Sequence, residues 1–154
     1  MFAYAASVDV NPPGATPVLT ADQVWRGLVM KAENAVPFVP AMSSCAVLER
    51  WADGLLREVV NDGKTFREKI TFTPPVQVRF ERLDSPEHAG WITNVISESS
   101  RGLLVTFTFA VRLPGVASDS DEEQRAGAAM KARYVGAIEA TLKTVRRLVA
   151  DGKL

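Results

Sequence analysis

Two charged side chains in the middle of the chain are placed to face each other. Arg57 and Glu68 stand at equal distances from Asp62-Gly63, a pair favoured in two-residue β-hairpin loops with both residues at positive φ. Residues that face each other across such a hairpin share one side of the sheet. A guanidinium and a carboxylate on one side of a sheet can bind a polar ligand, or bind each other.

Further positive charge is predicted on the same face. If Asp53-Gly54 also forms a two-residue loop, Arg50 faces Arg57, and Lys131 falls within the apolar arc of a helix near the C-terminus. Two arginines and a lysine against one glutamate leave positive charge inside an apolar groove. Such a groove suits a hydrophobic ligand that carries a carboxylate or an enolate.

The same residues also have a purely structural interpretation. Arg57 and Glu68 can form an ion pair across two strands near the rim of the sheet, while Lys131 extends to water along its aliphatic stem. In that case these charged side chains stabilise the sheet and leave no unpaired charge for a ligand.

The elements that carry these residues are delimited by turn signals. A helix is predicted from Thr20, which begins a capping box, to the residue before Pro37. Residues 2–10 are predicted as a first strand, and residues 43–113 as a meander of six antiparallel strands. The turn signals within that meander are Asp53-Gly54, Asp62-Gly63, Pro74-Pro75, Ser85-Pro86 and Ser100 to Gly102.

A long helix predicted over residues 120–151 closes one face of this sheet. Apolar side chains recur along it with helical periodicity, Ser120 and Glu123 form a capping box at its start, and Gly152 ends it. A helix of about 30 residues is roughly 45 Å long. Only a whole sheet can cover an apolar stripe of that length.

The inner faces of these elements define the candidate site. A long helix that crosses a concave sheet cannot fill the middle with side chains of ordinary size, so we expect an internal cavity. The residues predicted to line it and bind a ligand are Arg50, Arg57, Val59, Phe66, Glu68, Ile70, Val78, Phe107, Phe109, Met130, Lys131, Tyr134, Ile138 and Thr141.

Composition narrows the function classes. Eighteen basic residues balance eighteen acidic ones without a dense basic cluster, which argues against a nucleic-acid surface. One cysteine, Cys45, and one histidine, His88, do not make a zinc site of the usual kind, so no metal or cofactor is expected. The sequence lacks a signal peptide and a long apolar run, which predicts a cytoplasmic location and no membrane insertion. The length suits a single domain, residues 1–154.

The predicted order of strand, helix, six-stranded meander and long C-terminal helix resembles the helix-grip fold of the START and Bet v 1-like (SRPBCC) superfamily. This α+β fold wraps a curved antiparallel sheet of about seven strands around the C-terminal helix. In that superfamily the cavity between sheet and helix binds lipids, hormones or polyketides. The alternative is a cystatin-like or nuclear-transport-factor-like fold, which also packs a helix on a curved sheet but in which the long helix usually comes first. Three segments look like the AtaL-like group: Asn11-Pro12, Trp25-Arg26-Gly27-Leu28 and Glu81-Arg82-Leu83.

Three function classes remain open at this point. The leading hypothesis is a protein that binds a small hydrophobic or amphipathic molecule, including one with an acidic group, in the cavity between sheet and helix. The second is an enzyme, such as a polyketide-type cyclase or a hydrolase, that uses the inward polar residues for acid–base chemistry. The third is a structural homodimer module, which predicts a filled interior. The architectural motifs carry over no catalytic residue.

Overall fold

Over the residues that the structure describes, the chain folds as one strand, a helix, six further strands and a second, long helix. The computed structural model describes residues 1–83, 89–113 and 115–154. The predicted turn at Ser85-Pro86 and the predicted loop residue His88 lie outside the described residues. The elements are β1 (Phe2–Asp9), α1 (Ala21–Glu33), β2 (Met42–Trp51), β3 (Gly54–Asn61), β4 (Lys64–Thr73), β5 (Gln77–Arg82), β6 (Gly90–Ser99), β7 (Gly102–Val111) and α2 (Asp121–Ala150).

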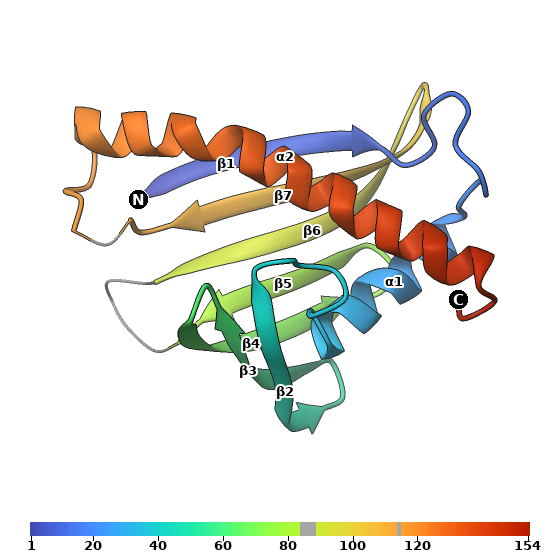
Figure 1. Ribbon diagram of the computed structural model, residues 1–154, viewed down its shortest axis with the longest axis horizontal. Helices are drawn as coiled ribbons and strands as arrows, with labels where there is room; N and C mark the ends of the chain where they lie inside the picture. Colours follow the sequence, from blue (N-terminus) through green and yellow to red (C-terminus); the bar gives the residue numbers. More distant parts are fainter. Residues whose placement is uncertain (84–88, 114) are drawn as a thin grey trace.

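The strands that the structure describes form one antiparallel sheet of seven strands in the order β1-β7-β6-β5-β4-β3-β2. The sheet curves, and α2 crosses its concave face along β1 and β7 while α1 lies near the end of α2 that leads to the C-terminus (Figure 1). This arrangement confirms the predicted helix-grip fold. It follows from the pattern of one apolar face on the sheet and one apolar stripe on each helix, which can be buried only against each other.

The hairpin between β3 and β4 confirms the register predicted from Asp62-Gly63. Both loop residues have positive φ, 48° for Asp62 and 75° for Gly63. Arg57 therefore pairs with Glu68, and the two flanking pairs are Val59 with Phe66 and Leu55 with Ile70. All six of these side chains are buried on the concave face.

The register predicted for β2 is wrong. Trp51 pairs with Gly54, so Gly54 belongs to β3, where a Cβ would clash with the carbonyl oxygen of Ile70. An irregularity between Val47 and Glu49 shifts the ladder again, so Val47, not Arg50, lies opposite Arg57. Arg50 leaves the groove and pairs with Glu33 at the end of α1, with Nη1 to Oε1 at 2.6 Å and 57% of its side chain exposed.

The helix α2 has the predicted ends but not the whole predicted inner face. Ser120 is the N-cap and accepts a hydrogen bond from the backbone of Glu123, and Asp151 is the C-cap. The Glu123 carboxylate accepts from the backbone of Asp119 instead of Ser120, so the predicted capping box is only half formed. Lys131 is exposed, and its ammonium lies over the ring of Tyr4 on β1, 5.5 Å from the ring centroid. The first half of α2 rests on this edge strand, so a side chain near the border of the arc reaches past the sheet to solvent.

Candidate ligand-binding site

A pocket of about 660 Å³ lies between α2, the concave face of β3, β4, β5 and β7, and the segment that leads into β2. It lies where an internal cavity was predicted, between the sheet and the C-terminal helix, but it is open to solvent, since Lys64, Arg112 and Arg133 on its wall are exposed. Its wall is formed by Lys31, Val39, Pro40, Ala41, Met42, Arg57, Asn61, Asp62, Lys64, Phe66, Glu68, Phe80, Arg82, Ile92, Phe107, Phe109, Val111, Arg112, Leu113, Met130, Arg133, Tyr134, Gly136, Ala137 and Ala140.

Half of the residues predicted to bind a ligand stand in this wall. They are Arg57, Phe66, Glu68, Phe107, Phe109, Met130 and Tyr134. Four others are buried in close-packed regions away from the wall, namely Val59, Ile70, Val78 and Ile138. Thr141 is buried as well, and its hydroxyl donates to the carbonyl of Ala137 one turn earlier in α2. Arg50 and Lys131 lie outside the pocket, for the reasons given above. The pocket is therefore displaced from the middle of the sheet toward the β3–β4 hairpin.

Arg57 is fixed by a buried ion pair. Its Nε and Nη2 donate to the same carboxylate oxygen, Oε2, of Glu68 at 2.9 and 2.6 Å. Its Nη1 donates to the carbonyl oxygens of Lys31 and Ala32, both at 2.9 Å, which lie in the last turn of α1. Carbonyls at a helix C-terminus lack helical partners and carry partial negative charge. Arg57 thus joins the end of α1 to the sheet.

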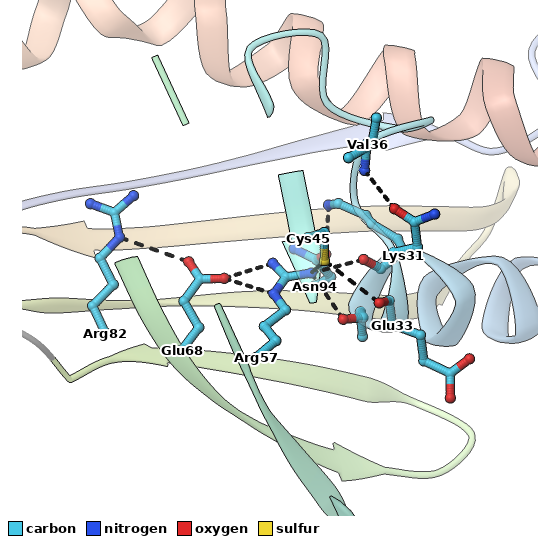
Figure 2. Close-up of polar contacts among 10 residues, drawn as sticks. Lys31, Glu33, Val36, Cys45, Arg57, Glu68, Arg82 and Asn94 are labelled. Carbon is cyan, nitrogen blue, oxygen red and sulfur yellow. Dashed lines mark hydrogen bonds and ion pairs between the residues drawn. The ribbon is translucent and has the colours of Figure 1, made fainter. Parts of the chain in front are cut away.

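The second oxygen of Glu68 points toward another cation on the pocket wall. Its Oε1 lies 3.9 Å from Nε of Arg82, the last residue of β5. Figure 2 shows Arg82, Glu68 and Arg57 in a row that leads toward α1. Among the described residues, Nε of Arg82 has no hydrogen-bond partner although it is buried. The Arg82 guanidinium stacks over Phe66, 4.6 Å from the ring centroid.

The sequence prediction missed Lys31, which is a functional residue candidate in the last turn of α1. Its amine donates to Oδ1 of Asn94 on β6 at 3.0 Å and lies 4.1 Å from the centroid of the Phe107 ring. Burial lowers the pKa of Lys31 to about 7; the nearby charge of Arg57 acts in the same direction, and Glu68 acts against it. Lys31 follows Leu28 by three residues, and that helical spacing on the apolar side of α1 was the signal available in the sequence.

Three further basic side chains line the pocket near the β3–β4 hairpin. They are Lys64, Arg112 and Arg133, and Arg133 pairs with Asp62 at 2.8 Å, which joins α2 to the hairpin loop. With Lys31, Arg57 and Arg82 the wall carries six basic side chains against two acidic ones, Asp62 and Glu68. The pocket is therefore positively charged, as the sequence predicted, but mostly through different residues.

The apolar part of the wall is largely aromatic. Phe109 and Tyr134 stack with their ring centroids 3.9 Å apart, and Phe107 meets Phe109 edge to face at 6.3 Å. Burial raises the pKa of the Tyr134 hydroxyl, which keeps it protonated at neutral pH. Flat aromatic surfaces beside cationic groups suit a ligand with a planar apolar body and an anionic substituent.

Other kinds of site find little support in the described part of the chain. No group of three or more His, Cys, Asp or Glu side chains there is placed to hold a metal ion. Cys45 lies outside the pocket wall and donates to the carbonyl of Glu33. None of the described helices has the length and apolar character needed to cross a membrane.

The curved antiparallel sheet, the C-terminal helix that crosses it and the pocket between them define a helix-grip protein of the START and Bet v 1-like class. Residues 4–152 match the AtaL family, described as "Acetylaranotin biosynthesis cluster protein L", and the chain belongs to this family. A comparison with curated protein sequences finds no match.

Solved structures with the same fold have low sequence identity to this chain. The aromatase/cyclase Zhui from Streptomyces sp. R1128 matches with a TM-score of 0.64 and 19% identity over 96% of this chain and 94% of that one. Ara h 8.0201 matches with a TM-score of 0.61 and 13% identity, over 94% and 97% of the two chains. The di-domain aromatase/cyclase StfQ from the steffimycin pathway has a TM-score of 0.70 at 11% identity over 97% of this chain. The chain spans about half the length of the di-domain proteins StfQ and BexL, at 51% and 49%.

Proposed function

We propose that this protein binds a small amphipathic molecule with a planar apolar body and an acidic group in the pocket between the sheet and α2. The observation that carries this proposal is the excess of basic side chains in a wall that is otherwise aromatic and aliphatic. Lys64, Arg112 and Arg133 are exposed to solvent, whereas Arg82 is mostly buried and shares Glu68 with Arg57. A mostly buried cation is costly unless it is fully paired. An anionic ligand supplies the missing partner.

Two buried polar atoms on the wall support the same proposal. Among the described residues, neither Nε of Arg82 nor Oδ1 of Asn61 has a hydrogen-bond partner. Buried polar atoms are nearly always paired in folded proteins. Both atoms are covered by neighbouring protein atoms, so a side-chain shift must expose them before a ligand with an acidic group for Arg82 and a hydrogen-bond donor for Asn61 satisfies both.

The other two function classes receive less support. An enzyme that uses Glu68 as a general acid needs that carboxyl to be available, whereas one of its oxygens accepts two hydrogen bonds from Arg57. A structural dimer module predicts a filled interior, whereas an open pocket of about 660 Å³ lies between the sheet and α2. Both observations support binding as the primary role of the site.

Arg82→Gln should weaken the binding of an anionic probe by about tenfold, because it removes one charge-assisted hydrogen bond. The probes are anilinonaphthalenesulfonate and its neutral parent phenylnaphthylamine, and the measurement is fluorescence titration. Binding of the neutral probe should change less than twofold. Arg79→Gln is the matched control, because Arg79 lies on the same strand but pairs with Glu81 outside the pocket.

Equal losses for the two probes would show that Arg82 only shapes the wall, and the proposed acidic group would then be wrong. Native mass spectrometry of the protein purified from its own cell extract gives an independent test. A retained molecule without an acidic group would also contradict the proposal.

A further inference from the structure

Lys31 is the one described lysine that is buried, and it lies where α1 meets the pocket. Its backbone carbonyl is held by Nη1 of Arg57, so the end of α1 is fixed against β3. Its amine contacts Asn94 on β6 and the Phe107 ring on β7. The side chain therefore bridges α1 to the far strands along the pocket wall, as the close-up in Figure 2 shows for Lys31 and Asn94.

No carboxylate is hydrogen-bonded or ion-paired to this amine among the residues that the structure describes. Glu68, the acidic group whose charge acts on this amine, is bound to Arg57. The other charged and titratable groups on the pocket wall are Asp62 and Lys64 at the β3–β4 hairpin, Arg82 from β5, Arg112 after β7, and Arg133 and Tyr134 from α2. The amine itself contacts the neutral side chains of Asn94 on β6 and Phe107 on β7. Both carboxylates of the wall, Asp62 and Glu68, are paired with arginines, so the surroundings of the amine are apolar or on balance cationic. Such surroundings favour the neutral, nucleophilic amine.

We propose that Lys31 is a covalent binding site for an aldehyde or ketone group of a pocket ligand, which it captures as an imine. The neutral amine attacks the carbonyl carbon and forms a C–N bond, which gives a carbinolamine. The oxygen then leaves as water with the two amine hydrogens, and a C=N bond remains. No oxidant, reductant or cofactor is required.

The side chain that holds the amine is also suited to this step. Asn94 is fully buried, its Oδ1 accepts from Lys31, and its Nδ2 has no hydrogen-bond partner among the described residues. Asn94 does not line the pocket, so its amide holds the amine from behind and leaves the pocket side of Lys31 open to a ligand carbonyl. The inference rests on the proposed function in one respect, because the same pocket must admit the ligand.

Reductive trapping tests the inference on the intact wild-type protein. Benzaldehyde and sodium cyanoborohydride are added at pH 7, and peptide mass spectrometry measures the adduct at each lysine. With a pKa of about 7, half of the Lys31 amines are neutral at that pH, whereas at the ordinary lysine pKa only about one amine in 3,000 is neutral. Lys31 should therefore be labelled about tenfold or more faster than the exposed Lys69 and Lys143.

A competition with the anionic probe and a pair of lysine variants serve as controls. Saturating anilinonaphthalenesulfonate should protect Lys31 from labelling, and unchanged labelling would place the reaction outside the pocket and overturn the inference. Lys31→Met should abolish the fast adduct, while Lys143→Met, a matched change on the outer side of α2, should leave it intact. A Lys31 adduct no faster than those of exposed lysines, in protein that still binds the anionic probe, would refute the covalent site and leave the proposed function standing. Failure of both trapping and probe binding would refute both.

Discussion

Replacing Glu68 by leucine should lower the free energy of unfolding by about 3–5 kcal/mol, the range typical when one partner of a buried ion pair is removed. Glu68 and Arg57 are both nearly inaccessible to solvent, and two of the guanidinium nitrogens donate to one Glu68 oxygen. Without that oxygen the buried positive charge keeps the two carbonyls at the end of α1 and a weak contact with the Cys45 sulfur. Urea unfolding followed by circular dichroism measures the change.

The neighbouring rung of the same hairpin provides the control. Glu58 and Arg67 form a pair on the outer face of β3 and β4, 3.3 Å apart, with 39% and 56% of their side chains exposed. Glu58→Leu should cost no more than about 1 kcal/mol, as exposed pairs usually do. If the two substitutions cost the same, burial is not what makes the inner pair important.

A double-mutant cycle separates the pair from its surroundings. Arg57→Leu combined with Glu68→Leu should cost less than the sum of the two single changes, because the second change removes the charge that the first leaves unpaired. The double variant should remain less stable than the wild type, since Arg57 also satisfies the carbonyls of Lys31 and Ala32. Strict additivity would contradict a direct interaction between Arg57 and Glu68.

The free energy of unfolding should rise by about 2 kcal/mol between pH 7 and pH 9 on account of Lys31 alone. Burial lowers the pKa of Lys31 in the folded protein to about 7 from the ordinary value of 10.5. Between these two values the unfolded chain binds more protons than the folded one, so stability increases with pH. Below pH 7 both states are protonated and the folded state carries the full cost of the buried charge.

The measurement compares urea unfolding of the wild type and of Lys31→Met at pH 7, 8 and 9. The difference between the two proteins should shrink or reverse in favour of the wild type as the pH rises, since methionine does not titrate. Stopping at pH 9 stays below the ordinary pKa of tyrosine, about 10. Lys143→Met, at an exposed site, should follow the wild-type profile. Parallel profiles for wild type and Lys31→Met would show that Lys31 is not desolvated in the folded state.

The sequence was sufficient for the architecture because local signals and global packing agree in this chain. Asp62-Gly63 dictates positive φ at both loop residues, and that single turn sets the pairing of Arg57 with Glu68. The capping residues Thr20 and Ser120 fix where the two helices begin. Each of these features depends on residues close together in the sequence, so no tertiary information was needed.

The sequence also predicted aromatic and charged side chains on the inner face, but only half of the residues that it named line the pocket. Asp53-Gly54 has the same sequence as the turn at Asp62-Gly63, but Gly54 lies in β3, so close to the Ile70 carbonyl that a side chain would not fit. The register of β2 changes as a result, and Arg50 points toward α1. A dipeptide cannot show whether its glycine is needed for a turn or for lack of a side chain. That choice depends on a strand sixteen residues away.

The positions of the two helices on the sheet determine which helical lysine lines the pocket. Lys31 joins the pocket because α1 ends against β3 and β6, and Lys131 leaves it because α2 rests on the edge strand β1. Helical periodicity gives the angle of a side chain about its own axis but not the position of that axis over the sheet. The sequence by itself therefore determined a helix-grip protein with a charged apolar groove, and only the tertiary structure decided which lysine the groove contains.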